Sequence, residues 1–293
     1  MASRSPSLES LRREIDRIDD DMHDLLMRRT EIVERVGTLK SRQAARLYIR
    51  PAREAAILRR LVKRHHGSLP APVVVRIWRE MVAATSLLQG PFSIAVHAPG
   101  GSVGYWDLAR DHYGSYTQMT LHASATQVIG AVVDGISTVA VLPMPEDGDP
   151  DPWWRLLIGA GDRTPRVVAR LPFIDNRVGR PGKLGALSIA LMDQEESGDD
   201  VTLVAVEANP ELSRTRLRQA FTAARLPATD IDAWQAEKNH DMRLHLIEIA
   251  DFVGPNDARL AAVEEALGEH ISRIIGLGGY ATPLGRHDGP GDG

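Results

Sequence analysis

The chain of 293 residues contains no cysteine. This absence excludes disulfide bonds, metal sites built on thiolates and catalysis by a cysteine nucleophile. No apolar run approaches the ~18 residues that cross a membrane, and the first ten residues lack the apolar segment of a secretory signal. We therefore expect a cytoplasmic protein with no membrane partner. Its 43% hydrophobic residues suffice for a sizeable core in two or three domains.

Charge is unevenly distributed along the chain. Residues 1–90 carry 18 Lys and Arg against 11 Asp and Glu, a net charge of +7, whereas the remainder carries 17 against 28, or −11. A basic segment attracts anions. The acidic remainder and the mixed charge of the first 42 residues argue against nucleic acid, so we expect a small anionic ligand.

One arginine interrupts a long apolar stripe near the N-terminus. Residues 8–42 read as a single helix of roughly 52 Å, which exceeds the reach of a small monomeric domain and predicts a helical partner. Arg29 stands where the heptad pattern requires an apolar residue, and a buried guanidinium is costly unless an anion meets it. Taken alone, Arg29 could also be a polar residue that sets the register of helix pairing. The stripe consists of Leu8, Leu11, Ile15, Ile18, Met22, Leu25, Ile32, Val36 and Leu39.

The remaining pattern divides the chain into segments. Residues 1–90 are expected to be all helical, with further helices from Pro51 to about His65 and from Val73 to Gln89. Residues 91–180 alternate strands and helices in a βαβαβ order, which predicts an α/β lobe. Residues 181–285 read as a small α+β domain, and residues 286–293, rich in Gly and Pro, as a disordered tail.

Several polar residues of the helical segment are candidates for an anion site. Lys40 lies eleven residues after Arg29 and shares its helix face, whereas Arg12 lies about 100° round the axis and would reach a site only in a partner chain. The candidate binding residues are Arg12, Arg29, Lys40, Arg53, Glu54, Thr85 and Gln89. Cations, one carboxylate and neutral hydrogen-bonding groups suit a small molecule with two carboxylates and neutral oxygens.

The segment Leu8–Gln89 resembles the all-helical chorismate mutase family in its bacterial, intertwined-dimer form. The resemblance rests on residues 11–19 (Leu-Arg-Arg-Glu-Ile-Asp-Arg-Ile-Asp), 25–29, 36–40, the pair Arg53-Glu54, and Thr85 with Gln89. One departure is that Arg50 stands where the family often has an acidic residue, in a loop that is one residue longer.

The resemblance implies an isomerase that converts chorismate to prephenate in phenylalanine and tyrosine biosynthesis. This [3,3] rearrangement is intramolecular and requires no nucleophile, proton transfer, metal or cofactor, so the protein has to hold the reactive conformer and stabilise charge on the breaking ether. By analogy, Arg12 comes from the other protomer of a homodimer, while Arg29 and Arg53 bind carboxylates. Lys40 and Gln89 face the ether oxygen, which makes them catalytic together with Arg29. Glu54 takes the substrate hydroxyl, and Thr85 occupies a position that is often Ser.

The second half resembles prephenate dehydratase, with departures. Residues 92–102 and 125–143 are similar to the opening of that domain, and residues 275–283 are similar to the end of an ACT-type regulatory domain. An expected Asn-Ser motif is replaced by Met144-Pro-Glu-Asp-Gly, and most of the second dehydratase lobe is missing. The usual Thr-Arg-Phe triplet is reduced to Thr164-Pro165-Arg166, and the Glu-Ser-Arg-Pro signature of phenylalanine binding is absent. We therefore expect a dehydratase-like and ACT-like region that is non-catalytic and serves structure or regulation.

Three alternatives remain at this point. The chain could be a bifunctional chorismate mutase/prephenate dehydratase, an isochorismate lyase on the same helical scaffold, or a non-catalytic amino-acid sensor whose helices only dimerise. The polar residues of the helical segment argue against a sensor, because dimerisation alone would favour Leu at position 29. His65-His66 reads as a polar helix end rather than a metal site. The effector, if there is one, is not encoded in a recognisable motif.

Overall fold

The computed structural model describes residues 7–41, 49–159, 161, 163–174, 184–236 and 239–285. The side chains of Lys40, Ser41, Asn239 and His240 lie outside this description, as does the tail 286–293, for which we expect disorder. None of the described helices is long and apolar enough to span a membrane.

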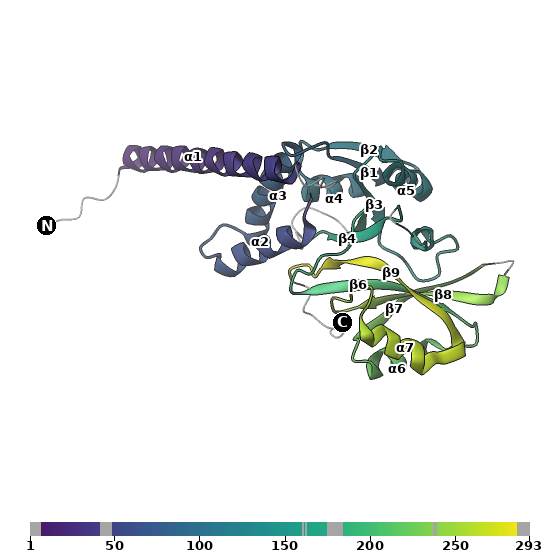
Figure 1. Cartoon of the computed structure of the whole chain (residues 1–293). Helices are drawn as coiled ribbons and strands as arrows, with labels where there is room; N and C mark the ends of the chain where they lie inside the picture. The colour runs from purple at the N-terminus through teal and green to yellow at the C-terminus, as the bar shows by residue number, and fades with distance from the viewer. Residues whose placement is uncertain are drawn as a thin grey trace.

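Three helices form the N-terminal segment, as the sequence predicts: α1 (Leu8–Ser41), α2 (Pro51–Arg64) and α3 (Ala71–Leu87). Pro51 and Pro72 lie in the first turns of α2 and α3, where the fixed φ of proline suits the helix and its missing N–H has no intrahelical role. Helices α2 and α3 pack against each other, while most of α1 projects from the molecule as a rod (Figure 1).

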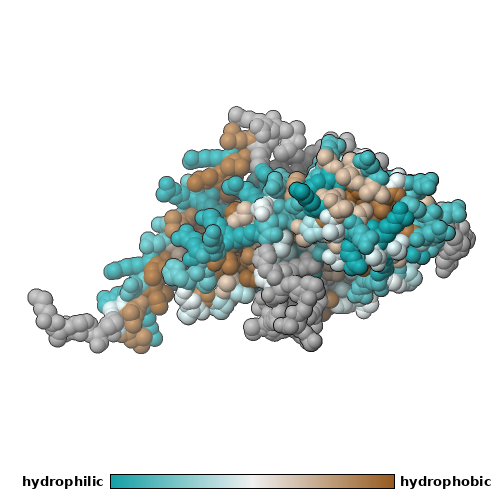
Figure 2. Space-filling view, turned by 90° about the horizontal axis from the view of Figure 1, so that it is seen from below, coloured by the Kyte–Doolittle hydropathy of each residue, from teal (hydrophilic) through white to brown (hydrophobic). Residues whose placement is uncertain are grey.

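The apolar stripe of α1 is exposed to solvent. Leu8 is 65% exposed, Ile15 57% and Leu25 64%, values expected of polar surface residues. Figure 2 shows the resulting brown band along the projecting rod. At 34 residues, α1 is about 51 Å long, and only the part around Arg29 to Gly37 is shielded by the rest of the chain. An exposed apolar stripe of this length marks an interaction surface.

The first half of the sheet has the expected βαβαβ order. Strands β1 (Ser93–His97), β2 (Gln118–His122) and β3 (Val139–Pro143) are parallel, with β1 between the other two. Helices α4 (Val103–Tyr113) and α5 (Ala125–Val133) connect them. The helices lie on opposite faces of the sheet, since α5 packs into one apolar cluster with Trp153 and Trp154 and α4 into the other.

The remaining strands extend this sheet rather than form a separate one. The order is β2-β1-β3-β5-β4-β9-β6-β8-β7. The added strands are β4 (Arg166–Leu171), β5 (Ala186–Ala190), β6 (Asp200–Ala208), β7 (Ala228–Ala236), β8 (Asn239–Ile249) and β9 (Ile271–Ala281). Helices α6 (Arg214–Ala223) and α7 (Ala258–Leu267) cover one face of the last four strands (Figure 1).

Strand β5 lies in a different place from the one we assigned to it. From the sequence we expected its residues in the α+β domain that begins at residue 181. In the structure β5 is antiparallel to both β3 and β4, so it belongs to the preceding lobe. Strand pairing of this kind depends on contacts distant in sequence, which no local pattern reveals. The two halves of the sheet meet instead at β4 and β9, through Val167 and Gly278.

Gly278 is required at this junction. Its φ is +94°, and a Cβ atom there would lie 2.4 Å from the carbonyl oxygen of Val167. Only glycine allows the backbones of the two halves to come this close.

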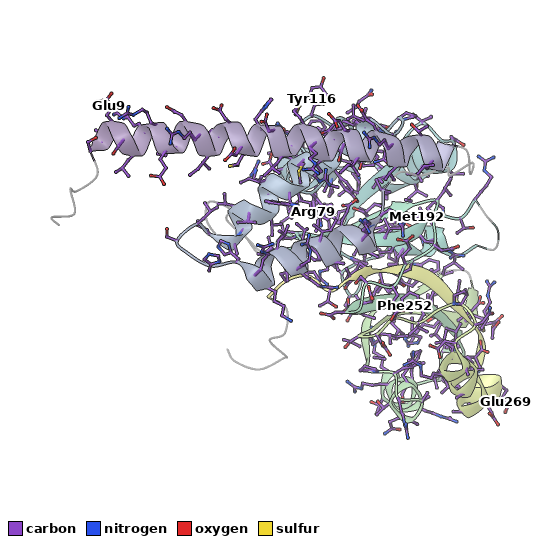
Figure 3. The ribbon with its side chains drawn as sticks, turned by 60° about the vertical axis from the view of Figure 1, so that its left-hand side comes forward. Glu9, Arg79, Tyr116, Met192, Phe252 and Glu269 are labelled. Carbon is purple, nitrogen blue, oxygen red and sulfur yellow. The ribbon has the colours of Figure 1, made fainter. Side chains whose placement is uncertain are left out.

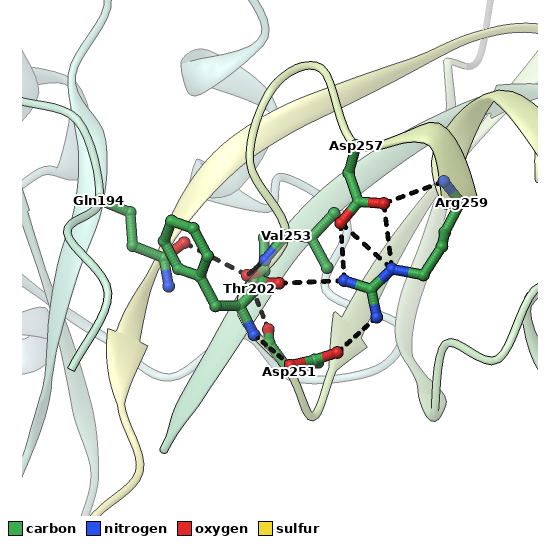
Figure 4. Close-up of polar contacts among 7 residues, drawn as sticks. Gln194, Thr202, Asp251, Val253, Asp257 and Arg259 are labelled. Atoms are coloured by element: carbon green, nitrogen blue, oxygen red, sulfur yellow. Dashed lines mark hydrogen bonds and ion pairs between the residues drawn. The ribbon is translucent and has the colours of Figure 1, made fainter. Parts of the chain in front are cut away.

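An arginine with two carboxylates holds the loop between β8 and α7 (Figure 4). Arg259 donates to Asp257 at 2.6 Å, to Asp251 at 2.5 Å and to the carbonyl of Phe252 at 3.2 Å. These bonds to Arg259 lower the pKa of Asp257, whose side chain also caps α7 by accepting from the backbone N–H of Arg259. The two carboxylates use most donors of this guanidinium, which makes Arg259 a structural clamp.

Candidate active site

Helix α1 contacts α3 where its apolar stripe is interrupted. Arg29 Nη1 donates to Thr85 Oγ1 over 3.4 Å, and Gln89 Nε2 donates to the carbonyl of Thr85 over 3.3 Å. Gly37 lies two turns after Arg29 on the same face, and a Cβ atom there would lie 3.2 Å from Gln89 Cγ. The structure thus brings three predicted site residues, Arg29, Thr85 and Gln89, together at one helix crossing.

The crossing has an excess of positive charge. The pKa of Arg29 is lowered, first by its partial burial and then by the positive charge of Arg53 at the start of α2. In the described part of the chain no carboxylate pairs with Arg29. Arg29 is partly buried and Arg53 is exposed, and an added negative charge would offset both their repulsion and the lost hydration of Arg29, which makes this place a candidate anion site.

Gln89 adds a hydrogen-bonding group to this place. Its Oε1 is buried and has no hydrogen-bond partner among the described residues. Thr85 is held firmly, since its hydroxyl lies 2.9 Å from the carbonyl of Met81 in the preceding turn. A ligand at this crossing would therefore meet the positive charge of Arg29 and Arg53 and, at Gln89 Oε1, a free hydrogen-bond acceptor.

Two predicted residues are not brought into this site within one chain. Arg12 is exposed on the projecting part of α1, 17 residues or about 26 Å along the helix from Arg29. No rearrangement of one straight helix can bring both residues to the same small molecule. Lys40 lies in the last turn of α1, but its side chain is outside the described residues.

Glu54 has a partner that the sequence analysis missed. Its Oε2 accepts from Arg79 Nη1 over 2.8 Å, and its Oε1 accepts a longer bond of 3.5 Å from the backbone N–H of Arg50. The described hydrogen bonds of Glu54 do not include Arg29, Thr85 or Gln89. Arg79 could have been found by the same signal as Arg29, because it lies four residues after Val75 and four before Ala83 on the buried face of α3.

Helix α2 is anchored to the sheet by a second arginine. Arg59 donates to four oxygens: Ser197 Oγ at 2.9 Å, the carbonyl of Ser197 at 3.2 Å, the carbonyl of Asp199 at 2.5 Å and the carbonyl of Thr282 at 3.0 Å. Arg50 adds an ion pair of 2.9 Å to Glu195. The site residues on α2 are therefore attached to the end of β9 and to the loop before β6.

The segment between β3 and β4 fills core space. The side chains of Trp153 and Trp154 are buried against the sheet, and Trp154 Nε1 donates to Asp232 over 2.8 Å. Arg166, the last residue of the altered Thr-Arg-Phe triplet, donates to the carbonyl of Gly276 over 2.6 Å. Among the described residues, no group of three or more His, Asp or Glu side chains is placed to hold a metal ion.

The fold and the site together define a protein with a helical domain, which contains the candidate anion site, joined to a mixed α/β sheet. Residues 11–90 match the family model described as chorismate mutase type II. This match covers all the predicted site residues.

The comparisons extend beyond this domain. A bifunctional chorismate mutase/prephenate dehydratase from Pseudomonas aeruginosa is 27% identical over 141 residues, which cover 47% of this chain and 38% of that protein. Because 141 residues exceed the length of the helical segment, the similarity includes part of the sheet. The chain thus spans well under two thirds of this relative.

Solved structures resemble the chain at the level of the fold. A structure described as GqqA, a novel type of quorum quenching acylases, is 17% identical and has a TM-score of 0.50, with 67% of this chain and 98% of that chain covered. A prephenate dehydratase from Streptococcus mutans is 18% identical with a TM-score of 0.46, covering 66% and 98%.

Proposed function

We propose that the protein is a chorismate mutase, which rearranges chorismate to prephenate in aromatic amino acid biosynthesis. The observation that carries this proposal is the half-buried Arg29 beside Arg53, with no described carboxylate to pair with it. Chorismate has two carboxylates, so it supplies the charge that this crossing lacks. The match of residues 11–90 to the chorismate mutase family supports the same reaction.

The rearrangement breaks one ether bond and forms one carbon–carbon bond within the substrate, so no residue has to form a covalent bond. Arg29 and Arg53 hold the two carboxylates and select the compact conformer in which the reacting carbons are close. Lys40 and Gln89 stabilise the negative charge that develops on the ether oxygen. Glu54 accepts the substrate hydroxyl, and Thr85 orients Arg29 through their hydrogen bond.

The active form is proposed to be a homodimer in which Arg12 crosses to the partner's site. The exposed apolar stripe of α1 supports this, because pairing with a second copy of the same helix would bury it. The distance between Arg12 and Arg29 along α1 supports it too, since both can act on one substrate only from different chains. A homodimer also shares the site symmetrically, with two equivalent sites per dimer.

The sheet region is proposed to be non-catalytic and to serve structure or regulation. The buried tryptophans between β3 and β4 and the internal bond of Arg166 support this, because these groups are occupied within the fold. The alternative is a bifunctional enzyme, like the relative from Pseudomonas aeruginosa. Formation of phenylpyruvate from prephenate by the purified protein would establish that alternative. The cytoplasmic location stays a prediction that cell fractionation tests.

The decisive experiment offers chorismate and isochorismate separately to the purified full chain. We expect loss of chorismate and accumulation of prephenate, with no pyruvate released from isochorismate. Release of pyruvate would instead identify a lyase. If neither substrate reacts while the protein is folded and dimeric, the assignment as an enzyme of this family is wrong.

A further inference from the structure

Arg79, labelled in Figure 3, forms a buried ion pair with Glu54 that joins α3 to α2. The two charged atoms are 2.8 Å apart, and the side chains are 6% and 16% exposed. Charged groups this well buried are retained only when they are paired. Each of the two charges therefore compensates for the burial of the other.

The guanidinium of Arg79 has little else to bind. Its Nε is buried without a hydrogen-bond partner among the described residues. On the sheet side it lies over the ring of Phe173, 5.3 Å from the ring centre, an arrangement that favours a cation. Burial lowers the pKa of Arg79, and the negative charge of Glu54 partly opposes this shift. Glu54 therefore compensates in part for the burial of Arg79.

Among the described residues, the ion-pair partner of Glu54 is Arg79. His112 on α4 is fully buried, and its pKa is held well below the ordinary value, first by burial and then by the positive charge of Arg79. Arg79 is left as the cation that sets the position of the Glu54 carboxylate.

We propose that Arg79 is a positioning residue for Glu54 in the rearrangement, and that Phe173, which follows strand β4, keeps Arg79 in place. This rests on the proposed function, in which Glu54 accepts the substrate hydroxyl. A carboxylate has about four lone-pair sites, so the bond from Arg79 leaves the others free for a ligand. Because the bond also prevents rotation of the carboxylate, Glu54 meets the substrate already oriented.

The test is a double-mutant cycle on kcat and KM, measured with the full chain. We expect Arg79→Gln to lower kcat/KM by roughly ten- to a hundredfold, because a small misplacement of a site residue has an effect of this size. In a Glu54→Gln background, Arg79→Gln should change kcat/KM by no more than about twofold, since it then has no carboxylate to position. Phe173→Leu should also lower kcat/KM, by a smaller factor than Arg79→Gln, and this loss should likewise disappear in the Glu54→Gln background.

Arg76→Gln is the matched control. Arg76 lies on α3 one turn before Arg79, is 55% exposed and pairs with Asp111 on α4 at 3.1 Å. Its replacement should leave kcat/KM within about twofold, as is usual for exposed ion pairs.

The results distinguish a failure of the proposed function from a failure of the role proposed for Arg79. If the wild-type protein does not convert chorismate, the proposed function fails and this inference fails with it. If the wild type is active, additive losses in the cycle, or a gain of activity in Arg79→Gln, overturn the inference alone. Removal of one partner of a buried pair can unfold a protein, so folding is checked by circular dichroism. Should Arg79→Gln not fold, Arg79→Lys replaces it in the cycle, with a smaller loss that must again disappear in the Glu54→Gln background.

Discussion

The arginines of the helical segment and of the C-terminal half are used in opposite ways. Arg259, at the start of α7, donates to two carboxylates and a backbone carbonyl. Arg29, on α1, has one long bond to a neutral hydroxyl and a second arginine as its electrostatic neighbour. An arginine whose donors are occupied by its own chain stabilises the fold, whereas one without a carboxylate has binding capacity left for a ligand.

Arg79 lies between these two cases. It has one carboxylate, like a structural arginine, but that carboxylate belongs to a proposed substrate-binding residue. The comparison therefore ranks the three arginines by how directly their removal should affect the reaction.

The largest effect is expected at the end of α1. Lys40→Ala should lower kcat by about a hundredfold or more, because it removes one donor to the developing charge, worth on the order of 3–4 kcal/mol of the barrier. Steady-state kinetics with chorismate measure this. Lys63→Ala, at an exposed position in the last turn of α2, is the control and should have no effect. A near-normal rate for Lys40→Ala would contradict the site assignment.

Next, mixed dimers test whether the site is shared. Arg12→Ala and Arg29→Ala should each be nearly inactive, but co-expression of the two should restore about a quarter of the wild-type activity. Half of the randomly formed dimers are mixed, and each mixed dimer contains one site with both arginines. Activity that does not recover, in dimers shown to be mixed, would place Arg12 outside the partner's site.

A smaller effect is expected where α1 approaches α3. Gly37→Ala favours the helix by roughly 0.5–1 kcal/mol, but the new methyl group presses on Gln89 Cγ at 3.2 Å. We expect kcat to fall severalfold while the melting temperature stays level or rises. Arg35→Ala, on an exposed face of the same helix, controls for general changes in α1. An unchanged kcat would show that the position of Gln89 is not critical.

The smallest effect on the reaction is expected at the Arg259 clamp. Asp257→Ala should leave kcat unchanged and lower the free energy of unfolding by about 1 kcal/mol, the usual value of a helix N-cap. Because the folded-state pKa of Asp257 is below its ordinary value, its contribution is full above that ordinary value and is lost as the pH falls through the folded-state pKa. Denaturant unfolding at neutral and acidic pH should therefore show a smaller difference between wild type and variant in acid. A loss of kcat in Asp257→Ala would contradict the view that Arg259 stabilises the fold and takes no part in the reaction.

Most secondary structure could be predicted from the sequence. The three N-terminal helices begin and end within a few residues of their expected bounds, and the βαβαβ order of the following lobe is as expected, because periodicity and proline are local signals. The position of β5 could not be predicted this way. Its pairing with β3 and β4 depends on residues far apart in the sequence.

The candidate site was predictable only in part. Arg29 is visible because it breaks a regular stripe, and Thr85 and Gln89 through the resemblance of their motif. Arg79 breaks the buried face of α3 in the same manner, but its shorter helix gives a weaker pattern. Its pairing with Glu54 and its contact with Phe173 join three segments and have no counterpart in a linear motif.

The sequence alone determined which residues carry charge onto apolar helix faces, and hence that an anion or a carboxylate has to meet them. Only the tertiary structure decided which of these applies to each arginine. Glu54 reaches Arg79 because α2 and α3 pack together, and no described carboxylate reaches Arg29 because α1 meets the chain only near its end. The physical reason is that the cost of burying a charge is set locally by the side chain, whereas the compensating charge is supplied by whatever the fold brings within a few ångströms.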